Sequence, residues 1–243
     1  MSKRLANYTD PELIMDKYGA DALRYYLLSS PVMQAENLSF ADEGVKEAMQ
    51  KVLMLLNNIL SFYKTYEEPE NTKKESLLDK IFHHQSAVES DNILDQWLIA
   101  KLNILIDEVT KQMEIYDLPR SVRPIQEFID EFSTWWLRRS RDRFKGNDQA
   151  DKQKALMTFK YVLLELSKVM APFLPFISEN VYQEVGGHLE SVHLEKWPEG
   201  QKADESLIVQ MLEIRKIIEL GLAKRSEAGI KIRQPLNKIS AFG

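Results

Sequence analysis

The chain has 243 residues, of which 44% are hydrophobic and 28% charged, and its formal net charge is −5 at pH 7. This composition predicts a globular protein with a substantial core, and the negative charge excludes nucleic-acid binding by bulk attraction. The chain lacks cysteine, and its four histidines (His83, His84, His188 and His193) show no ligand spacing, so we expect neither disulfides nor a metal site.

The sequence contains no apolar run near the ~20 residues of a membrane span, and its first ten residues lack the apolar segment of a signal peptide. We therefore expect a cytoplasmic protein that binds neither membranes nor DNA. The sequence also shows no internal repeat, no Gly-rich phosphate loop and no Ser, His, Asp arrangement typical of hydrolases.

The N-terminal part predicts two short helices followed by a long one. A proline after an N-capping aspartate predicts a helix that begins at Pro11 and ends at Gly19. Asp21 is expected to cap the second helix, and Asp42 a long helix with a periodic apolar stripe. The polar stretch 67–75 is typical of a solvated loop.

Two helices that pack against each other are expected in the middle of the chain. The first begins near Asn92, and the second covers 122–146, with Pro124 in its first turn and Gly146 just past its end. The second helix has its apolar residues at spacings of three and four, which predicts a buried stripe of Val122, Ile125, Phe128, Ile129, Phe132 and Trp136. The short link between the two helices favours an antiparallel pair.

A dense arginine cluster follows this stripe. At about 100° per residue, Arg139 and Arg143 continue the apolar stripe, whereas Arg138 and Arg141 point to the other side. We expect the first pair to be structural, with carboxylate partners on neighbouring helices. The outward pair beside Trp135 offers phosphate-binding forks and a stacking plane, the combination that unpaired nucleotides require. This pattern predicts an RNA contact.

The C-terminal part predicts further helices and one extended element. Helices are expected from about Leu156 to Met170, from Pro175, and from Glu205 to Glu227. Residues 230–233 alternate apolar and basic side chains, which is typical of an edge strand. The whole pattern predicts an all-α helical bundle with a short extended element near the C-terminus.

Several motifs, in this order, resemble class I aminoacyl-tRNA synthetases. Residues 1–4 (MSKR) are similar to the KMSKS-type loop of that family, without its first lysine and with arginine for the last serine. The stretches 17–40 (KYGADALRYYLLSSPVMQAENLSF), 135–144, 171–176 (APFLPF) and 232–236 (IRQPL) most resemble the isoleucine-specific members.

The resemblance implies three parts and an incomplete enzyme. Residues 1–40 would be the end of the catalytic region, 41–200 the helical anticodon-binding domain, and 201–243 a C-terminal helix with the start of a truncated junction domain. The HIGH-type motif, the nucleotide fold and the editing insertion of the family are absent from this sequence. The resemblance therefore implies that this chain alone is inactive and works with an upstream catalytic domain of the same protein.

The resemblance also assigns candidate site residues. Lys3 matches the loop's second lysine, which stabilises the ATP phosphates, so Ser2, Lys3 and Arg4 are the expected ATP contacts. Basic side chains that the residue pattern leaves exposed are the expected tRNA contacts, together with one aromatic ring: Trp135, Arg138, Arg141, Lys231 and Arg233. No cofactor is expected in this chain, whereas ATP and Mg²⁺ are implied for the whole enzyme.

Three functional hypotheses follow from these observations. The first is the C-terminal tRNA-binding part of an isoleucine-specific synthetase, which attaches L-isoleucine to its tRNA with ATP. The second is the same region of a valine-specific synthetase. The third is a stand-alone helical RNA-binding module that is not part of an enzyme.

Overall fold

The computed structural model describes residues 10–67, 90–238 and 240. By its contacts the chain divides into two compact units, Met1–Lys202 and Ala203–Gly243, and each is described by itself. Every regular element in the described ranges is helical, so the predicted all-α class is confirmed there.

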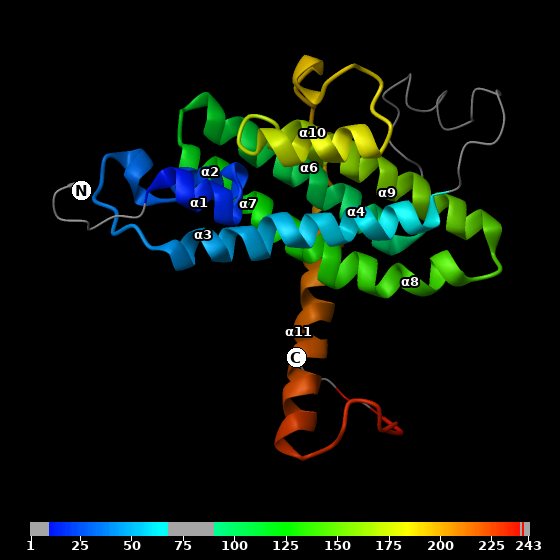
Figure 1. Cartoon of the computed structure of the whole chain (residues 1–243). Coiled ribbons are helices and arrows are strands. Elements are labelled where there is room, and N and C mark those ends of the chain that lie inside the picture. Colours follow the sequence, from blue (N-terminus) through cyan, green and yellow to red (C-terminus); the bar gives the residue numbers. More distant parts are fainter. Residues whose placement is uncertain (1–9, 68–89, 239, 241–243) are drawn as a thin grey trace. The chain divides into compact units, whose positions relative to one another are not determined.

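The first unit is a helical bundle (Figure 1). Within its described residues, two α-helices are continued by π-helices. Its elements in chain order are α1 (Pro11–Tyr18), α2 (Ala20–Leu28), the 3₁₀ turn η2 (Pro31–Gln34), α3 (Asp42–Ala48), the π-helix η3 (Met49–Met54), α4 (Leu55–Tyr66), α6 (Ile93–Glu114), α7 (Leu118–Glu131), the π-helix η4 (Phe132–Leu137), α8 (Arg138–Lys145), α9 (Gln149–Met170), α10 (Pro175–Glu184) and the 3₁₀ turn η5 (Val192–Leu194). The long helix predicted from Asp42 is present as α3, η3 and α4, but the predicted cap is wrong, because Asp42 is the first residue of α3 and the N-cap position is Ala41.

Local capping signals place the first helix as predicted. The side chain of Asp10 accepts a hydrogen bond from the Glu12 N–H, and Gly19 adopts a φ of 88° that ends α1. The expected role of Asp21 is wrong, because α2 begins one residue earlier and Asp21 lies inside it. The side chain of Asp21 instead accepts a hydrogen bond of 2.7 Å from the Ile177 N–H, in the first turn of α10.

A second contact joins α2 to the same part of the chain. The guanidinium of Arg24 donates to the carbonyl oxygens of Phe173 at 3.0 Å and of Pro172 at 3.1 Å. These carbonyls lie between α9 and α10, where the helix is broken at the predicted proline. Through Asp21 and Arg24, α2 therefore satisfies backbone groups that the two helix ends leave without a helical partner.

The helix pair α6 and α7 packs as expected across a short link, but the start of α7 differs from the prediction. Its N-cap is Asp117, whose side chain accepts a hydrogen bond from the Arg120 N–H. Pro119 occupies the first turn, so Pro124 lies inside the helix. Both Pro119 and Pro124 could stand in the first turn of a helix, so the prolines alone do not show where α7 begins. The N-cap at Asp117 shows that Pro119 is the one in the first turn.

The π-helix η4 changes which side chains face the core. A π turn holds one residue more than an α turn, which rotates everything after it by about 100°. After Phe132 and Trp136, the buried positions are therefore Ser140 and Phe144, and Arg139 is exposed. The prediction that Arg139 lies on the core side is wrong, because it assumed an uninterrupted α-helix.

The core of the bundle is an aromatic cluster built from α4, η4, α8 and α9. Its members are Phe62, Tyr63, Phe132, Trp136, Phe144 and Phe159. The ring centroids of Trp136 and Phe159 are 5.2 Å apart at 72°, an edge-to-face geometry that aromatic pairs prefer. Phe159 also lies 5.3 Å from Phe132, so α9 is held against η4 largely by aromatic contacts.

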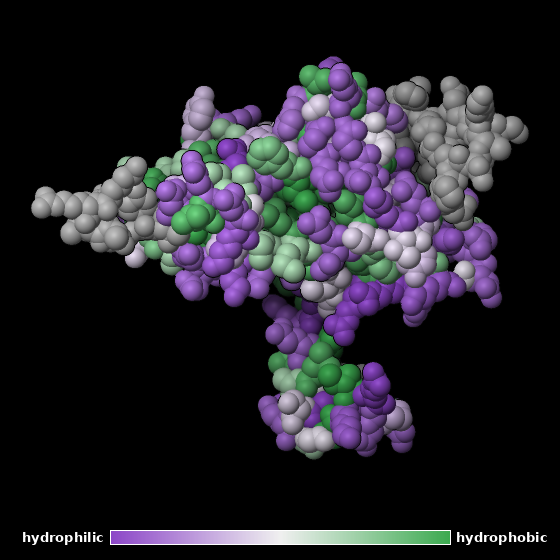
Figure 2. Space-filling view, in the orientation of Figure 1, coloured by the Kyte–Doolittle hydropathy of each residue, from purple (hydrophilic) through white to green (hydrophobic). Residues whose placement is uncertain are grey.

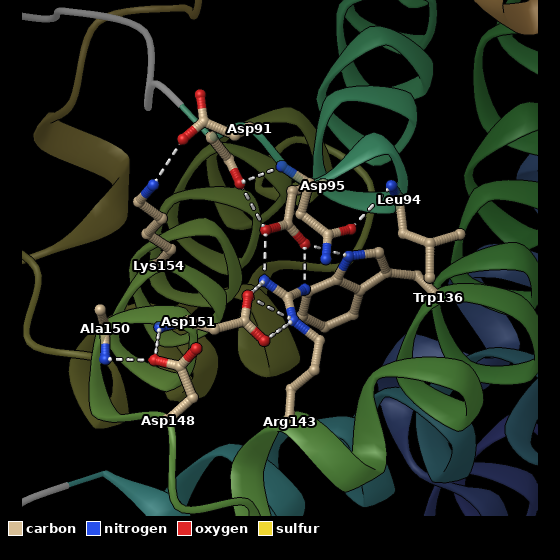
Figure 3. Close-up of polar contacts among 11 residues, drawn as sticks. Asp91, Leu94, Asp95, Trp136, Arg143, Asp148, Ala150, Asp151 and Lys154 are labelled. Atoms are coloured by element: carbon tan, nitrogen blue, oxygen red, sulfur yellow. Dashed lines mark hydrogen bonds and ion pairs between the residues drawn. The ribbon is translucent and has the colours of Figure 1, made fainter.

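A buried charge pair lies beside this cluster (Figure 3). The side chain of Asp95, on α6, is fully buried and accepts hydrogen bonds from Arg143 Nη1 at 2.7 Å and Nη2 at 2.9 Å. It also accepts from Trp136 Nε1 at 2.9 Å and from Ser90 Oγ at 2.7 Å. The predicted carboxylate partner on a neighbouring helix is thus confirmed for Arg143.

The charge of Arg143 is strongly favoured at this site. Burial lowers the pKa of its guanidinium, but the hydrogen bonds and charges of Asp95 and Asp151 outweigh burial and raise that pKa above its ordinary value. Arg143 is consequently a permanent cation, and the carboxylate of Asp95 stays buried only because this cation is there.

The second unit contains α11 (Glu205–Glu227), whose bounds agree with the prediction. The predicted edge strand 230–233 is wrong, because these residues form a turn closed by a hydrogen bond of 3.0 Å from the Gln234 N–H to the Lys231 carbonyl. The guanidinium of Arg225 donates to the carbonyls of Lys231 and Ile232. An edge strand needs a partner strand for these groups, and a side chain of α11 satisfies them instead.

We predict that Arg143→Ala lowers the free energy of unfolding by about 3 to 5 kcal/mol, because it leaves the buried Asp95 carboxylate without a counter-charge. Urea unfolding at pH 7 measures this change. The matched control Arg138→Ala removes an exposed arginine of the same helix and should shift stability by no more than about 0.5 kcal/mol. Equal losses in the two variants would contradict the assignment.

Candidate nucleic-acid interface

The candidate interface is the exposed face of α8, which directly follows η4. Arg138, Arg139, Arg141 and Lys145 are all exposed on this helix of eight residues. Its one acidic side chain, Asp142, leaves the exposed face with a clear excess of positive charge. In Figure 2 hydrophilic colouring predominates in the region of α8. The chain is acidic overall, so this helix is a local exception of the kind that phosphate binding requires.

Two arginines of this face lie over aromatic rings. The guanidinium carbon of Arg139 is 3.2 Å from the ring centroid of Trp135, and that of Arg141 is 5.9 Å from the ring centroid of Phe62. Both distances are within the range of cation–π attraction. The contacts hold planar cations beside planar rings, an arrangement that suits stacking with nucleobases.

The exposure predicted for two arginines of this face is confirmed, and their contact with RNA stays a prediction. Arg138 and Arg141 are exposed, as predicted, whereas Trp135, on the preceding π-helix, is half-buried and lies against Arg139. Sequence reasoning missed two members. Arg139 was assigned to the core, and Phe62 comes from α4, far away in the sequence. No sequence signal connects Phe62 with Arg141, because their contact exists only after α4 packs beside η4 and α8.

Hydrogen bonds at the turn between α8 and α9 hold the C-terminal end of α8 in place. Asp148 caps α9 by accepting hydrogen bonds from the N–H groups of Ala150 and Asp151. Arg143 donates to Asp151 through Nε and Nη2, with distances between 2.7 and 3.0 Å, so it bridges α8 to α9 as well as to α6. Arg143 therefore holds the inward face of α8 in place (Figure 3). The outward arginines of the same helix are exposed.

The other predicted site residues are not brought to α8 by the described contacts. Lys231 and Arg233 are exposed and belong to the second unit, within the turn after α11. The single strip that the sequence predicted from Arg138, Arg141, Lys231 and Arg233 stays a prediction. Ser2, Lys3 and Arg4 lie outside the described residues, and so do their predicted ATP contacts.

Two further observations concern the described residues. No group of three or more His, Asp or Glu side chains among them is arranged to hold a metal ion. Within the same ranges, no helix combines the length and the apolar character that crossing a membrane requires.

Comparison with protein families identifies the class. Residues 95–240 match the model of the anticodon-binding domain of tRNA ligases, and residues 1–39 match that of class I tRNA synthetases (I, L, M and V). The first match covers more than half of the chain and contains all of α8. The chain therefore belongs to the anticodon-binding domain family of tRNA ligases.

Curated relatives narrow the class. The chain is 42% identical, over its whole length, to the isoleucine-tRNA ligase of Chlamydia trachomatis serovar L2b, and covers 23% of that protein. It is 41% identical over 97% of its length to the isoleucine-tRNA ligase of Protochlamydia amoebophila, of which it covers 22%. The chain corresponds to the anticodon-binding region of isoleucine-tRNA ligase and spans less than a quarter of these relatives.

A solved structure agrees in fold. The chain resembles the agnB2 LeuRS of Agrobacterium radiobacter K84, determined as a ternary complex with tRNA and LeuAMS. The TM-score is 0.53 at 22% identity, and the match covers 86% of this chain and 22% of the other. At this identity the likeness shows a shared helical arrangement.

The corner at Asp151 predicts a dependence of stability on pH. Hydrogen bonds from Arg143 lower the pKa of Asp151 below its usual 3.8, and the opposing effect of burial is weaker. A carboxyl whose pKa is lowered by folding stabilises the folded state above its unfolded pKa, and this contribution disappears as pH falls through the folded pKa. Wild type should therefore exceed Asp151→Asn in stability at pH 7, and the difference should shrink below about pH 4.

Urea unfolding of both proteins between pH 7 and pH 3 measures this difference. Asp148→Asn is the matched control, because Asn also caps helices and the Asp148 side chain bonds backbone N–H groups only. A difference between wild type and Asp151→Asn that stays constant over this range would contradict the role of the Arg143 ion pair.

Proposed function

We propose that this chain is the tRNA-binding part of an enzyme that attaches L-isoleucine to its tRNA with ATP, and that its RNA partner is isoleucine tRNA. The observation that carries the proposal is the exposed face of α8, where three arginines stand beside Trp135 and Phe62 inside the family's anticodon-binding domain. The names of the relatives support isoleucine as the amino acid.

The arginines of α8 would bind the RNA backbone. A guanidinium matches the phosphate group with two parallel hydrogen bonds, and Arg138 and Arg141 are exposed on one short helix. Lys231 and Arg233 are included in the proposal as further backbone contacts from the turn after α11. Because the whole chain is acidic, phosphate binding must be confined to such local groups.

Base recognition is assigned to the stacked pair of Arg139 and Trp135. Unpaired bases stack on aromatic rings and on guanidinium planes alike, and here the guanidinium carbon of Arg139 already lies 3.2 Å from the ring centroid of Trp135. A base can extend this stack or take the place of Arg139 on the indole. Either contact is worth about 1 to 3 kcal/mol for each stacked base. Because any of the bases can stack in this way, the contact contributes more to affinity than to base selectivity.

The three-part division remains part of the proposal. Residues 1–40 would end the catalytic region, 41–200 would form the anticodon-binding domain, and 201–243 would begin a junction domain. In the whole enzyme, Ser2, Lys3 and Arg4 would contact ATP, with Lys3 stabilising the phosphates while the isoleucyl-adenylate forms. Mg²⁺ would be bound with ATP in the upstream catalytic domain of the same protein.

We predict that the chain binds an isoleucine anticodon stem-loop with an affinity that falls steeply with salt. Four phosphate contacts, at 0.7 to 0.9 released counterions each, give a slope of about 3 to 4 in log affinity against log salt. The double variant Arg138→Glu, Arg141→Glu should lose most of this binding. Fluorescence anisotropy at several salt concentrations measures both the affinity and the slope.

The matched control reverses two exposed lysines of the long helix, Lys46→Glu and Lys51→Glu, and so changes net charge equally. This control should keep the affinity within a few-fold. Binding that ignores salt, or that survives reversal at α8, would refute the basic face. A valine anticodon stem-loop distinguishes the valine-specific alternative, which predicts the opposite preference between the two RNAs.

A further inference from the structure

We propose that Tyr116, at the tip of the α6–α7 hairpin, is a second RNA-binding group that stacks on an unpaired nucleotide of the same RNA. The inference rests on the proposed function, because it takes the ligand of α8 to be tRNA. It assigns a new contact at the opposite end of the rod formed by α7, η4 and α8. Leu118 and Arg141, near its two ends, are about 35 Å apart at 1.5 Å per residue.

The backbone at Tyr116 is in a conformation that favours glycine. Its φ is 60°, in the left-handed region, and the turn has the hydrogen bonds of a Schellman helix end. The Tyr116 N–H donates to the Met113 carbonyl at 3.0 Å, and the Asp117 N–H donates to the Gln112 carbonyl at 2.9 Å. Glycine is the usual residue at this position, because any other side chain costs free energy there.

Folding gives no visible compensation for this strain. The side chain of Tyr116 is 88% exposed, the largest fraction among the large hydrophobic side chains in the described part of the chain. Its neighbour Ile115 is 66% exposed. One exposed apolar residue is ordinary, but an exposed ring on a strained backbone adds cost without burying area. A ligand that covers the ring would explain why tyrosine stands where glycine fits better.

The charges around the tip favour RNA as that ligand. Lys111 is exposed in the last turn of α6, and Arg120 and Arg123 are exposed in the first turns of α7. The acidic residues of the same turns are Glu114 and Asp117, and Asp117 caps α7 and also pairs with Arg120 at 3.6 Å. The guanidinium of Arg123 donates to the Ser29 carbonyl and is still exposed to solvent, so the three cations outnumber the two carboxylates at the tip. An aromatic ring next to several cations is the arrangement that binds unpaired nucleotides, where the base stacks and the cations attract phosphates.

The test uses Tyr116→Gly, because a structural role of the ring predicts lower stability in this variant, whereas a binding role predicts lower affinity for tRNA without a loss of stability. Glycine removes the ring and relieves the left-handed strain, so the melting temperature should stay the same or rise. The affinity for full-length isoleucine tRNA should fall by about 5- to 150-fold, the equivalent of one stacked base. Tyr116→Asn tests the same loss with a side chain that tolerates this backbone, and Tyr116→Phe should retain the affinity.

Fluorescence anisotropy with labelled tRNA and thermal unfolding of each variant give both readouts. Tyr116→Gly and Tyr116→Asn variants that bind tRNA like wild type would overturn the inference, including in the case that the tip contacts a protein instead. If only the α8 double variant loses binding, this inference fails and the proposed function stands. A wild-type chain that binds no tRNA would overturn both.

Discussion

The bundle depends on keeping one carboxylate charged in its interior. Asp95 has no solvent contact, and an isolated buried charge costs several kcal/mol. Arg143 supplies the counter-charge, and Trp136 and Ser90 supply the remaining hydrogen bonds. Because Asp95 comes from α6, Trp136 from η4 and Arg143 from α8, this requirement fixes how the three elements pack. Arg143 extends the same restraint to α9 through Asp151, so the exposed arginines of α8 stand on a rigid support.

Much of the fold could be predicted because its signals are local. The cap at Asp10, the glycine at position 19, the proline break before α10 and the bounds of α11 each depend on a few neighbouring residues. Asp21 misled the prediction, because it also looks like a local cap while its real partner is the N–H of Ile177, 156 positions away. The prediction of a strand at 230–233 failed for a related reason. Alternation predicts a strand only when another strand can pair with it.

The candidate site was predictable to the extent that helical periodicity holds. The exposed positions of Arg138 and Arg141 and the inward position of Arg143 agree with the wheel even though the π turn rotates them, because Arg143 lies near the edge of the buried stripe. The exposure of Arg139 could not be predicted in this way, because the pattern of apolar side chains does not reveal the extra residue that η4 holds in its π turn. The tip at Tyr116 was missed for a different reason. A positive φ at a residue other than glycine, asparagine or aspartate is rare enough that sequence reasoning excludes it.

The π-helix η4 also makes the number of residues in this rod a determinant of its surface. If η4 became a plain α-helix without losing a residue, the part that follows would rotate back by about 100°. Arg139 would then occupy the buried place of Ser140, and Arg143 the place of Phe144 within the aromatic cluster. Deletion of one residue of η4 together with this change would leave the part that follows in its present orientation, so the extra residue of the π turn keeps the arginines of α8 outside and Phe144 in the aromatic cluster.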